Sequence, residues 1–269
     1  NHSEEEVQQI INHIATNLLS VLMIITLIAV ITAPLIIFLF AWGFYFKSDA
    51  TQFQLASSML RITFPYLLLI SLTALSGSIL NTYDNFTVPA FTPVLLNISL
   101  ILSAIFLSRY LSTPIMALAW GVLIGGIAQL AFQIPFLRKI KRLPKLKFGH
   151  HQALTTLKKR MLPALFGVSV SQINLLVDTM IASTLIAGSV SWLYYSDRLL
   201  ELPLALIGIA IATVALAKLS NYHARKDSRG FTETIDKALI LAILLGVPAC
   251  MGLVLLSEEL IVTLFQYEA

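Results

Sequence analysis

Three ionisable residues stand close together in a segment that is otherwise apolar: Asp197, Arg198 and Glu201. A charged side chain at the centre of a membrane helix costs roughly 2.5–3.5 kcal/mol on insertion scales, and such residues usually face a water-filled cavity or a partner charge along a transport path. Arg198 and Glu201 are three residues apart, so they share one face of a helix. Because a guanidinium binds two oxygens at once, Arg198 predicts a substrate that carries phosphate or carboxylate.

A fourth ionisable residue, Asp178, comes ten residues before a turn expected near Gly188, and Arg198 comes ten residues after that turn. At a rise of about 1.5 Å per residue, both lie roughly 15 Å from the outer surface, near the middle of a membrane. They can form an ion pair if their faces meet. The four groups have a formal charge of −2, from three carboxylates and one guanidinium. The site could hold a cation, a proton or the balanced head group of a large substrate; the alternative is a self-neutralising cluster that only packs helices.

The composition is that of an integral membrane protein. Hydrophobic residues make up 57% of the 269 residues and charged residues only 12%, whereas a soluble domain has about 25% charged residues. A spanning helix needs about 20 mostly apolar residues, and we expect an all-α bundle of seven such helices. The predicted spans are 17–46, 55–81, 87–109, 114–137, 161–186, 189–217 and 237–266. Prolines inside five of them predict kinks, at Pro34, Pro65, Pro93, Pro203 and Pro248.

Lysine and arginine gather in two connections between these spans. The connection 138–160 holds nine of them and the connection 218–237 holds five. The two connections are two spans apart and therefore share a side, which the excess of positive charge predicts to be cytoplasmic. A nucleic-acid patch needs a soluble context that is missing here, so we interpret the basic run as a topological anchor with some attraction to anionic lipid head groups.

The chain is expected to be an internal fragment of a larger membrane protein, or an incomplete gene product, since it lacks an initial Met and ends directly after an apolar segment. Segments 34–40 and 259–265 match weakly, as in transporters built from two parallel six-helix halves. The predicted organisation is four helices of an N-terminal lobe (1–137), a cytoplasmic connection (138–160) and three helices of a C-terminal lobe (161–269). No Walker motif, metal-ligand spacing or nucleophile constellation occurs, and Gly121, Gly125, Gly126 and Ala128 are expected to be close-packing positions.

Several motifs resemble the MurJ (MviN) family of lipid II flippases, within the multidrug/oligosaccharidyl-lipid/polysaccharide exporter superfamily. The resemblance covers nearly the whole chain, and its motifs are RITFPYLLLISL (61–72), GSILNTY (77–83), PAFTPVLLNIS (89–99), ALAWGV (117–122), GVSVSQI (167–173) and GSVSWLYYSDRLLELP (188–203). It implies a protein of fourteen helices in which two six-helix lobes surround a central cavity. This chain resembles helices three to nine, so the fragment is expected to be inactive alone.

The resemblance also implies roles for single residues. Arg198 matches a cavity arginine that contacts the diphosphate of the substrate or its sugar-peptide, Glu201 a cavity carboxylate and Ser191 a cavity-lining serine. We include Asp197 as a further candidate for substrate binding. Asp178 matches a position that looks, in some members, like part of a sodium site. No cofactor is expected besides a possible sodium ion and the membrane potential.

The implied function is a flippase, not an enzyme. It would move undecaprenyl-diphosphate-linked muropeptide (lipid II) from the inner to the outer leaflet of the bacterial inner membrane by alternating access, for cell wall synthesis. One alternative is a related exporter of other lipid-linked oligosaccharides or of small cations, although Arg198 argues against a cation exporter. A third possibility is a membrane scaffold that organises cell-wall enzymes without transport.

Overall fold

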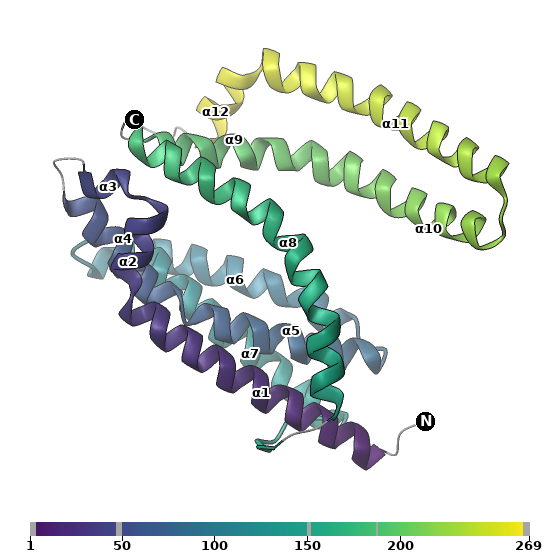
Figure 1. The fold of residues 1–269 in the computed structure, drawn as a ribbon. Coiled ribbons are helices and arrows are strands. Elements are labelled where there is room, and N and C mark those ends of the chain that lie inside the picture. Colours follow the sequence, from purple (N-terminus) through teal and green to yellow (C-terminus); the bar gives the residue numbers. More distant parts are fainter. Residues whose placement is uncertain (1–3, 47–49, 150–151, 187, 266–269) are drawn as a thin grey trace. The chain divides into compact units, whose positions relative to one another are not determined.

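The computed structural model describes residues 4–46, 50–149, 152–186 and 188–265, which form helices and connections without any strand (Figure 1). Seven helices in this part of the chain are long and apolar enough to cross a membrane, so the expected all-α architecture of seven spans is confirmed. The chain divides into two compact units, Asn1–Thr184 and Leu185–Ala269. The assignment of the helices to two lobes remains a prediction.

Unit 1 begins with three helices where one span was expected. α1 (Glu4–Ile31) starts well before the predicted residue 17, and α2 (Ala33–Phe40) and α3 (Gly43–Phe46) follow it. Three glutamates occupy the first turn of α1, where the positive end of the helix dipole stabilises them. α1 ends just before Pro34, which has no N–H to donate to the preceding turn. The single span 17–46 was therefore wrong in its extent.

The rest of unit 1 follows the predicted spans more closely. A break separates α4 from α5 at Pro65, where the sequence predicted a kink. At Pro93 the helix α6 continues without a break. The remaining elements of the unit are α4 (Ala50–Thr63), α5 (Tyr66–Thr82), α6 (Thr87–Phe106), the 3-10 turn η1 (Leu107–Tyr110), α7 (Met116–Lys139) and α8 (Gln152–Thr184).

Small side chains let α6 and α7 approach closely. A Cβ on Gly121 would lie 3.0 Å from the Cβ of Ser103, and one on Gly125 would lie 2.7 Å from a methyl carbon of Leu96. Because α6 and α7 lie this close, the Ser99 hydroxyl of α6 donates a hydrogen bond of 2.8 Å to the carbonyl of Gly121 on α7. Small residues and interhelical hydrogen bonds are the means by which helices associate in a membrane. The expected close packing at these glycines is confirmed.

The same helices bury polar side chains near the apolar cluster of Ile79, Leu80, Val88 and Leu137. Gln129 and Gln133 of α7 are almost completely buried. Their amide groups donate hydrogen bonds to the backbone oxygen and to the hydroxyl of Thr92, at 3.2 and 3.0 Å. The Tyr66 hydroxyl donates to the Gln129 carbonyl oxygen at 3.3 Å. Bonds of this kind link α5, α6 and α7.

The basic connection between α7 and α8 is shorter than predicted, because α7 reaches Lys139 and α8 already begins at Gln152. Its residues 142–148 have no helical structure, and they contact α1. The Arg142 guanidinium donates a 2.9 Å hydrogen bond to the carbonyl of Glu4 and forms an ion pair with its carboxylate. Gln8 donates a 3.1 Å bond to the carbonyl of Leu143. The connection is therefore fixed to the first helix by polar contacts.

Unit 2 contains α9 (Ser189–Pro203), the π-helix η2 (Leu204–Ile209), α10 (Ala210–Ala224), α11 (Ser228–Leu255) and α12 (Ser257–Phe265). Gly188, at a φ of +99°, precedes α9. Pro203 cannot donate to the preceding turn, and a wider π turn follows it directly. The Asp227 side chain caps α11 by accepting a 3.0 Å bond from the N–H of Gly230. α10 and α11 run side by side and are joined by a short turn (Figure 1).

Candidate functional site

Arg198 and Glu201 form an ion pair on the exposed face of α9. A terminal nitrogen of Arg198 lies 2.6 Å from a carboxylate oxygen of Glu201, and both side chains are more than half exposed. The predicted sharing of one helix face is therefore confirmed. On the other side, the guanidinium carbon of Arg198 lies 4.8 Å from the centre of the Tyr194 ring. Tyr194 stands one turn before Arg198, so an aromatic face and a carboxylate together orient this cation.

The two other candidates on α9 differ in their relation to Arg198. Ser191 is exposed and precedes Arg198 by seven residues, which is about two helical turns and places the two residues roughly 20° apart around the helix. Asp197 is only partly exposed and lies roughly 100° from Arg198 around the axis. α9 thus brings Arg198, Glu201 and Ser191 to one side, with Asp197 at its edge. Within the described residues, the ion pair of Arg198 is formed with Glu201 and not with Asp197.

Asp178 belongs to the other compact unit. It is exposed on α8 and forms no ion pair with any described residue. Arg198 belongs to unit 2, and the expected pairing of Asp178 with Arg198 stays a prediction. Asp178 can supply a carboxylate oxygen to a cation, which is the ligand type that a hard cation prefers. No group of three or more His, Cys, Asp or Glu residues that could hold a metal ion occurs in the part of the chain that the structure describes.

Aromatic residues around Arg198 are the part of the site that sequence reasoning missed. Tyr194 lies four residues before Arg198, and this spacing was a usable signal for a cation–π contact. The next residue, Tyr195, stacks on Phe265 of α12, with ring centres 4.5 Å apart and planes 21° apart. This second contact ties the start of α9 to the last described residue of the chain. The spacing between Tyr195 and Phe265 in the sequence gives no hint of it.

The arrangement on α9 is suited to bind an anion reversibly. A guanidinium has five N–H donors in one plane, and the hydrogen bond to Glu201 uses one nitrogen of Arg198. The Tyr194 ring lies against the guanidinium, and the N–H donors that neither neighbour uses can bind oxygens of a phosphate or carboxylate. Glu201 competes for the same cation, which weakens the hold on any anionic ligand.

Comparison with known proteins gives a consistent result. A family model described as lipid II flippase MurJ matches residues 1–269. The chain is 44% identical over 270 residues to a probable lipid II flippase MurJ of Haemophilus influenzae, which covers 96% of this chain and 53% of the relative. It is 48% identical over 248 residues to a probable lipid II flippase MurJ of Vibrio cholerae, covering 90% of this chain and 47% of the relative.

A solved structure is similar as well. It is described as lipid II flippase MurJ in an inward closed conformation, and it aligns with a TM-score of 0.83 at 30% identity. The alignment covers 100% of this chain and 54% of that structure. The chain therefore spans about half the length of the relatives that it matches.

Proposed function

This chain belongs to the lipid II flippase MurJ family, and on that premise we propose that it forms about half of a transporter that moves lipid II across the bacterial inner membrane. The observation that carries the proposal is the exposed guanidinium of Arg198, oriented by Tyr194 and Glu201, in a helical segment long and apolar enough to span a membrane. A fixed charge at such a position is the expected mark of a transport path. The transported molecule would be undecaprenyl-diphosphate-linked muropeptide, and the work would be translocation without covalent chemistry.

Arg198 would bind the diphosphate of lipid II, because its planar fork matches two phosphate oxygens at once. Ser191, two turns away on the same side, is positioned to meet a sugar or peptide group of the same head group. Asp197 would lie at the edge of the α9 surface that binds the head group. Glu201 would compete with the diphosphate for Arg198, so that the substrate is held firmly enough to enter and loosely enough to leave. Rocking of two lobes would expose this site first to the inner side and then to the outer side of the membrane.

The membrane potential would assist the outward step. One elementary charge crossing 100 mV is worth about 2.3 kcal/mol, and an inside-negative potential favours the movement of negative charge outward. Asp178 would contribute one oxygen ligand to a sodium site. Its remaining ligands would come from the part of the family's length that this chain does not span, which would also supply the remaining walls of the cavity.

The proposal is tested by replacing Arg198 with Ala in the protein that contains this chain. Lipid II translocation is expected to be lost while the amount of protein in the membrane stays normal. Arg109→Ala is the matched control, because Arg109 is an exposed arginine in η1, far from α9 in the sequence. Full retention of transport in the Arg198 variant contradicts the proposal. Loss of another lipid-linked oligosaccharide with unchanged lipid II movement would favour the related exporter instead.

A further inference from the structure

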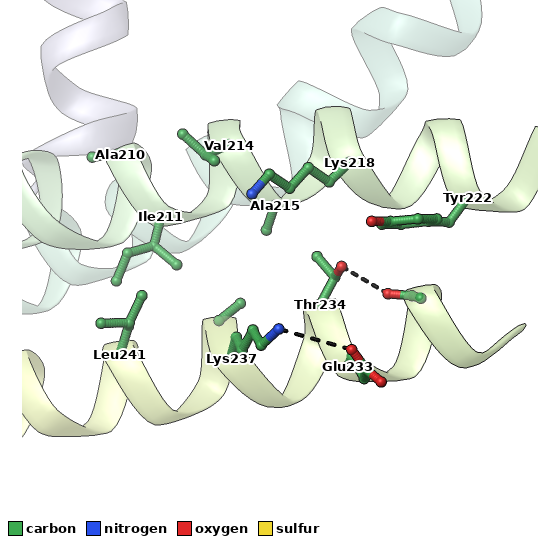
Figure 2. Close-up of a pocket in the computed structure, with 12 residues that line it drawn as sticks. Ala210, Ile211, Val214, Ala215, Lys218, Tyr222, Glu233, Thr234, Lys237 and Leu241 are labelled. Carbon is green, nitrogen blue, oxygen red and sulfur yellow. Dashed lines mark hydrogen bonds and ion pairs between the residues drawn. The ribbon is translucent and has the colours of Figure 1, made fainter. Parts of the chain in front are cut away.

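A cavity of about 390 Å³ lies between α10 and α11 in unit 2 (Figure 2). Its walls are of two kinds. Apolar side chains line one part, among them Ile211, Val214 and Leu241, and polar side chains line the other, among them Lys218 and Glu233. Figure 2 shows Ile211 and Leu241 facing each other across the gap, and Lys218 and Tyr222 further along α10. A cavity of this size is within the range of small-molecule and lipid sites, about 300–1,000 Å³.

Both lysines of the cavity stand where an apolar helix segment ends. Residues 202–217 contain no charged side chain, and Lys218 follows them directly; residues 238–256 contain none either, and Lys237 precedes them. The two lysines therefore mark the same boundary on two neighbouring helices. Lysine at such a boundary places its ammonium group at the level of the lipid head groups. The apolar part of the cavity lies on the membrane side of this boundary and the polar part on the other.

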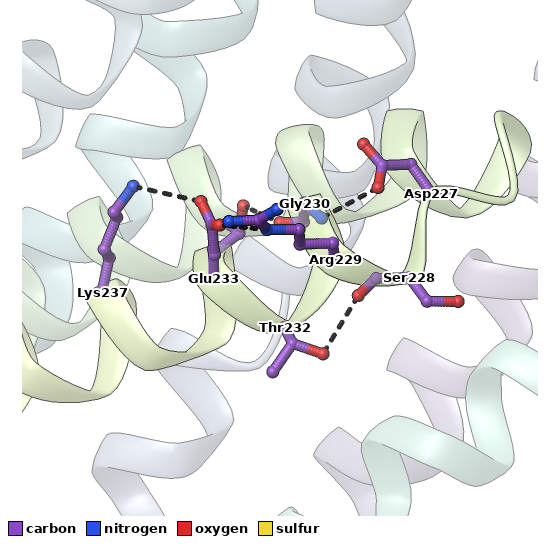
Figure 3. Close-up of polar contacts among 8 residues, drawn as sticks. Asp227, Ser228, Arg229, Gly230, Thr232, Glu233 and Lys237 are labelled. Atoms are coloured by element: carbon purple, nitrogen blue, oxygen red, sulfur yellow. Dashed lines mark hydrogen bonds and ion pairs between the residues drawn. The ribbon is translucent and has the colours of Figure 1, made fainter.

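Among the residues that line the cavity, two are lysines, Lys218 and Lys237, and one is a carboxylate, Glu233, whose ion pairs are drawn in Figure 3. Glu233 is shared between two cations, since its carboxylate lies 3.2 Å from the Nε of Arg229 and 3.8 Å from the Nζ of Lys237. Lys218 forms no ion pair with any residue that the structure describes. Glu233 thus pairs with Lys237 of the lining and with Arg229 outside it, and Lys218 is left to balance an external negative charge.

Gly230 allows close packing at the turn between α10 and α11. A Cβ on Gly230 would lie 2.6 Å from a ring carbon of Tyr222 and 2.7 Å from a carboxylate oxygen of Asp227. Only glycine therefore allows the Tyr222 ring to lie against the start of α11 while Asp227 caps that helix. The hydroxyl of Thr234 is occupied by a 2.8 Å bond to the carbonyl of Gly230. The two lysines and the Tyr222 hydroxyl are therefore the lining groups that can donate to a ligand here.

We propose that this cavity binds one glycerophospholipid with a net negative head group. The phosphate would lie between Lys218 and Lys237, and part of an acyl chain would lie along Ile211, Val214 and Leu241. Basic pockets between membrane helices on the cytoplasmic side are suited to such lipids, and the connection that joins these helices is predicted to be cytoplasmic. The site is separate from Arg198. It does not rest on the proposed transport of lipid II, so either proposal can fail while the other stands.

Native mass spectrometry of the purified protein in mild detergent tests this site. We expect phosphatidylglycerol to remain bound and phosphatidylcholine, whose head group is neutral overall, to bind much more weakly. Combined Lys218→Gln and Lys237→Gln substitutions should reduce the phosphatidylglycerol-bound fraction about tenfold. Combined Arg225→Gln and Lys226→Gln substitutions are the matched control, because they also remove two positive charges from this connection and neither residue lines the cavity. An equal loss in the control, or equal binding of the two lipids, overturns the proposal.

A second comparison separates a lipid from free phosphate. Ala215 lines the cavity beside Lys218 (Figure 2), and Ala215→Leu would fill space that the acyl chain needs. This variant should bind less phosphatidylglycerol, and millimolar inorganic phosphate should not displace the lipid from the unaltered protein. Displacement by phosphate, or full lipid binding in Ala215→Leu with normal helical content, would show that only the head group is recognised and would contradict the proposal.

Discussion

The side-chain oxygen of Asn12 accepts a hydrogen bond from the backbone N–H of Lys145, which is 133 positions later in the chain, at an N···O distance of 2.8 Å. Four residues along the same helix, the Thr16 hydroxyl accepts a bond of 2.8 Å from the N–H of Lys147. Four helical residues advance about 6.0 Å and two extended residues about 6.6 Å. The spacing between the Lys145 and Lys147 N–H groups therefore matches the spacing between Asn12 and Thr16 along α1. Side chains of α1 accept hydrogen bonds from these alternate backbone N–H groups of the connection.

Replacing Asn12 with Ala should loosen this contact. The Lys145 N–H would lose its partner, and a net loss of about 1 kcal/mol corresponds to roughly fivefold faster local opening. Hydrogen–deuterium exchange of residues 142–148 measures this change. Gln9→Ala is the control, since Gln9 is exposed on the same helix and should leave the exchange unchanged. Identical exchange in both variants would show that the connection does not depend on Asn12.

The number of spans and the Arg198–Glu201 pair were predictable from the sequence because both follow from local rules. A run of about 20 apolar residues indicates a spanning helix wherever it occurs, and residues three apart meet on any helix. The close-packing glycines on α7 were predictable for the same reason, because small residues at a spacing of about one turn lie on one face.

The contact between α1 and the basic connection could not be predicted in this way. It joins side chains of α1 to backbone N–H groups, which every residue except proline has, so the sequence around Lys145 carries no specific signal. The start of α1 at Glu4 was missed because only apolar length was used to place the span, whereas the polar first turns of a helix can extend beyond the membrane. The sequence therefore predicted that seven spanning helices exist, but not the residues at which all of them begin and end.

Gly125→Ala should destabilise the packing of α6 on α7. The added methyl group would lie 2.7 Å from a methyl carbon of Leu96 and 3.3 Å from the Leu96 Cα. Overpacking of this kind costs about 1–3 kcal/mol, and thermal unfolding in detergent should show a lower midpoint. Gly246→Ala is the matched control, because no atom lies within 4 Å of its added methyl group. A fall in the midpoint for Gly246→Ala but not for Gly125→Ala would contradict this account.

Tyr194 should act on transport through its ring and not through its hydroxyl. The Arg198 guanidinium carbon lies 4.8 Å from the ring centre, and Phe keeps the negative ring face that attracts a cation. Tyr194→Phe should therefore retain lipid II translocation, and Tyr194→Leu should reduce it by about threefold to tenfold, in keeping with a weak cation–π contact at an exposed site. A translocation assay at equal membrane abundance distinguishes the two. Equal loss in both variants would assign the role to the hydroxyl.

Asp178→Asn tests the proposed sodium ligand. The amide keeps the size of the side chain and removes the negative charge that a cation needs. If the carboxylate binds sodium, the dependence of transport on sodium concentration should shift to higher concentration or disappear. Asp197→Asn, which removes a carboxylate from α9, should leave that dependence in place. An unchanged sodium response in Asp178→Asn would leave this residue without a role in cation binding.

Glu201→Gln should strengthen substrate binding and slow transport at the same time. The carboxylate of Glu201 lies 2.6 Å from Arg198, so it occupies a donor that a diphosphate would also use and repels the negative charge of that diphosphate. Gln keeps the shape and removes the charge. Binding of lipid II to the purified protein should therefore tighten, whereas translocation per unit time should fall because release becomes slower.

The comparison of binding with turnover decides between two roles for Glu201. Glu258→Gln removes an exposed carboxylate from α12 and should change neither quantity, which controls for the general loss of negative charge. If Glu201→Gln weakens both binding and transport, the carboxylate orients Arg198 rather than competing with the substrate. If it tightens binding and slows transport, the ion pair on α9 limits affinity so that the substrate can leave on the far side of the membrane.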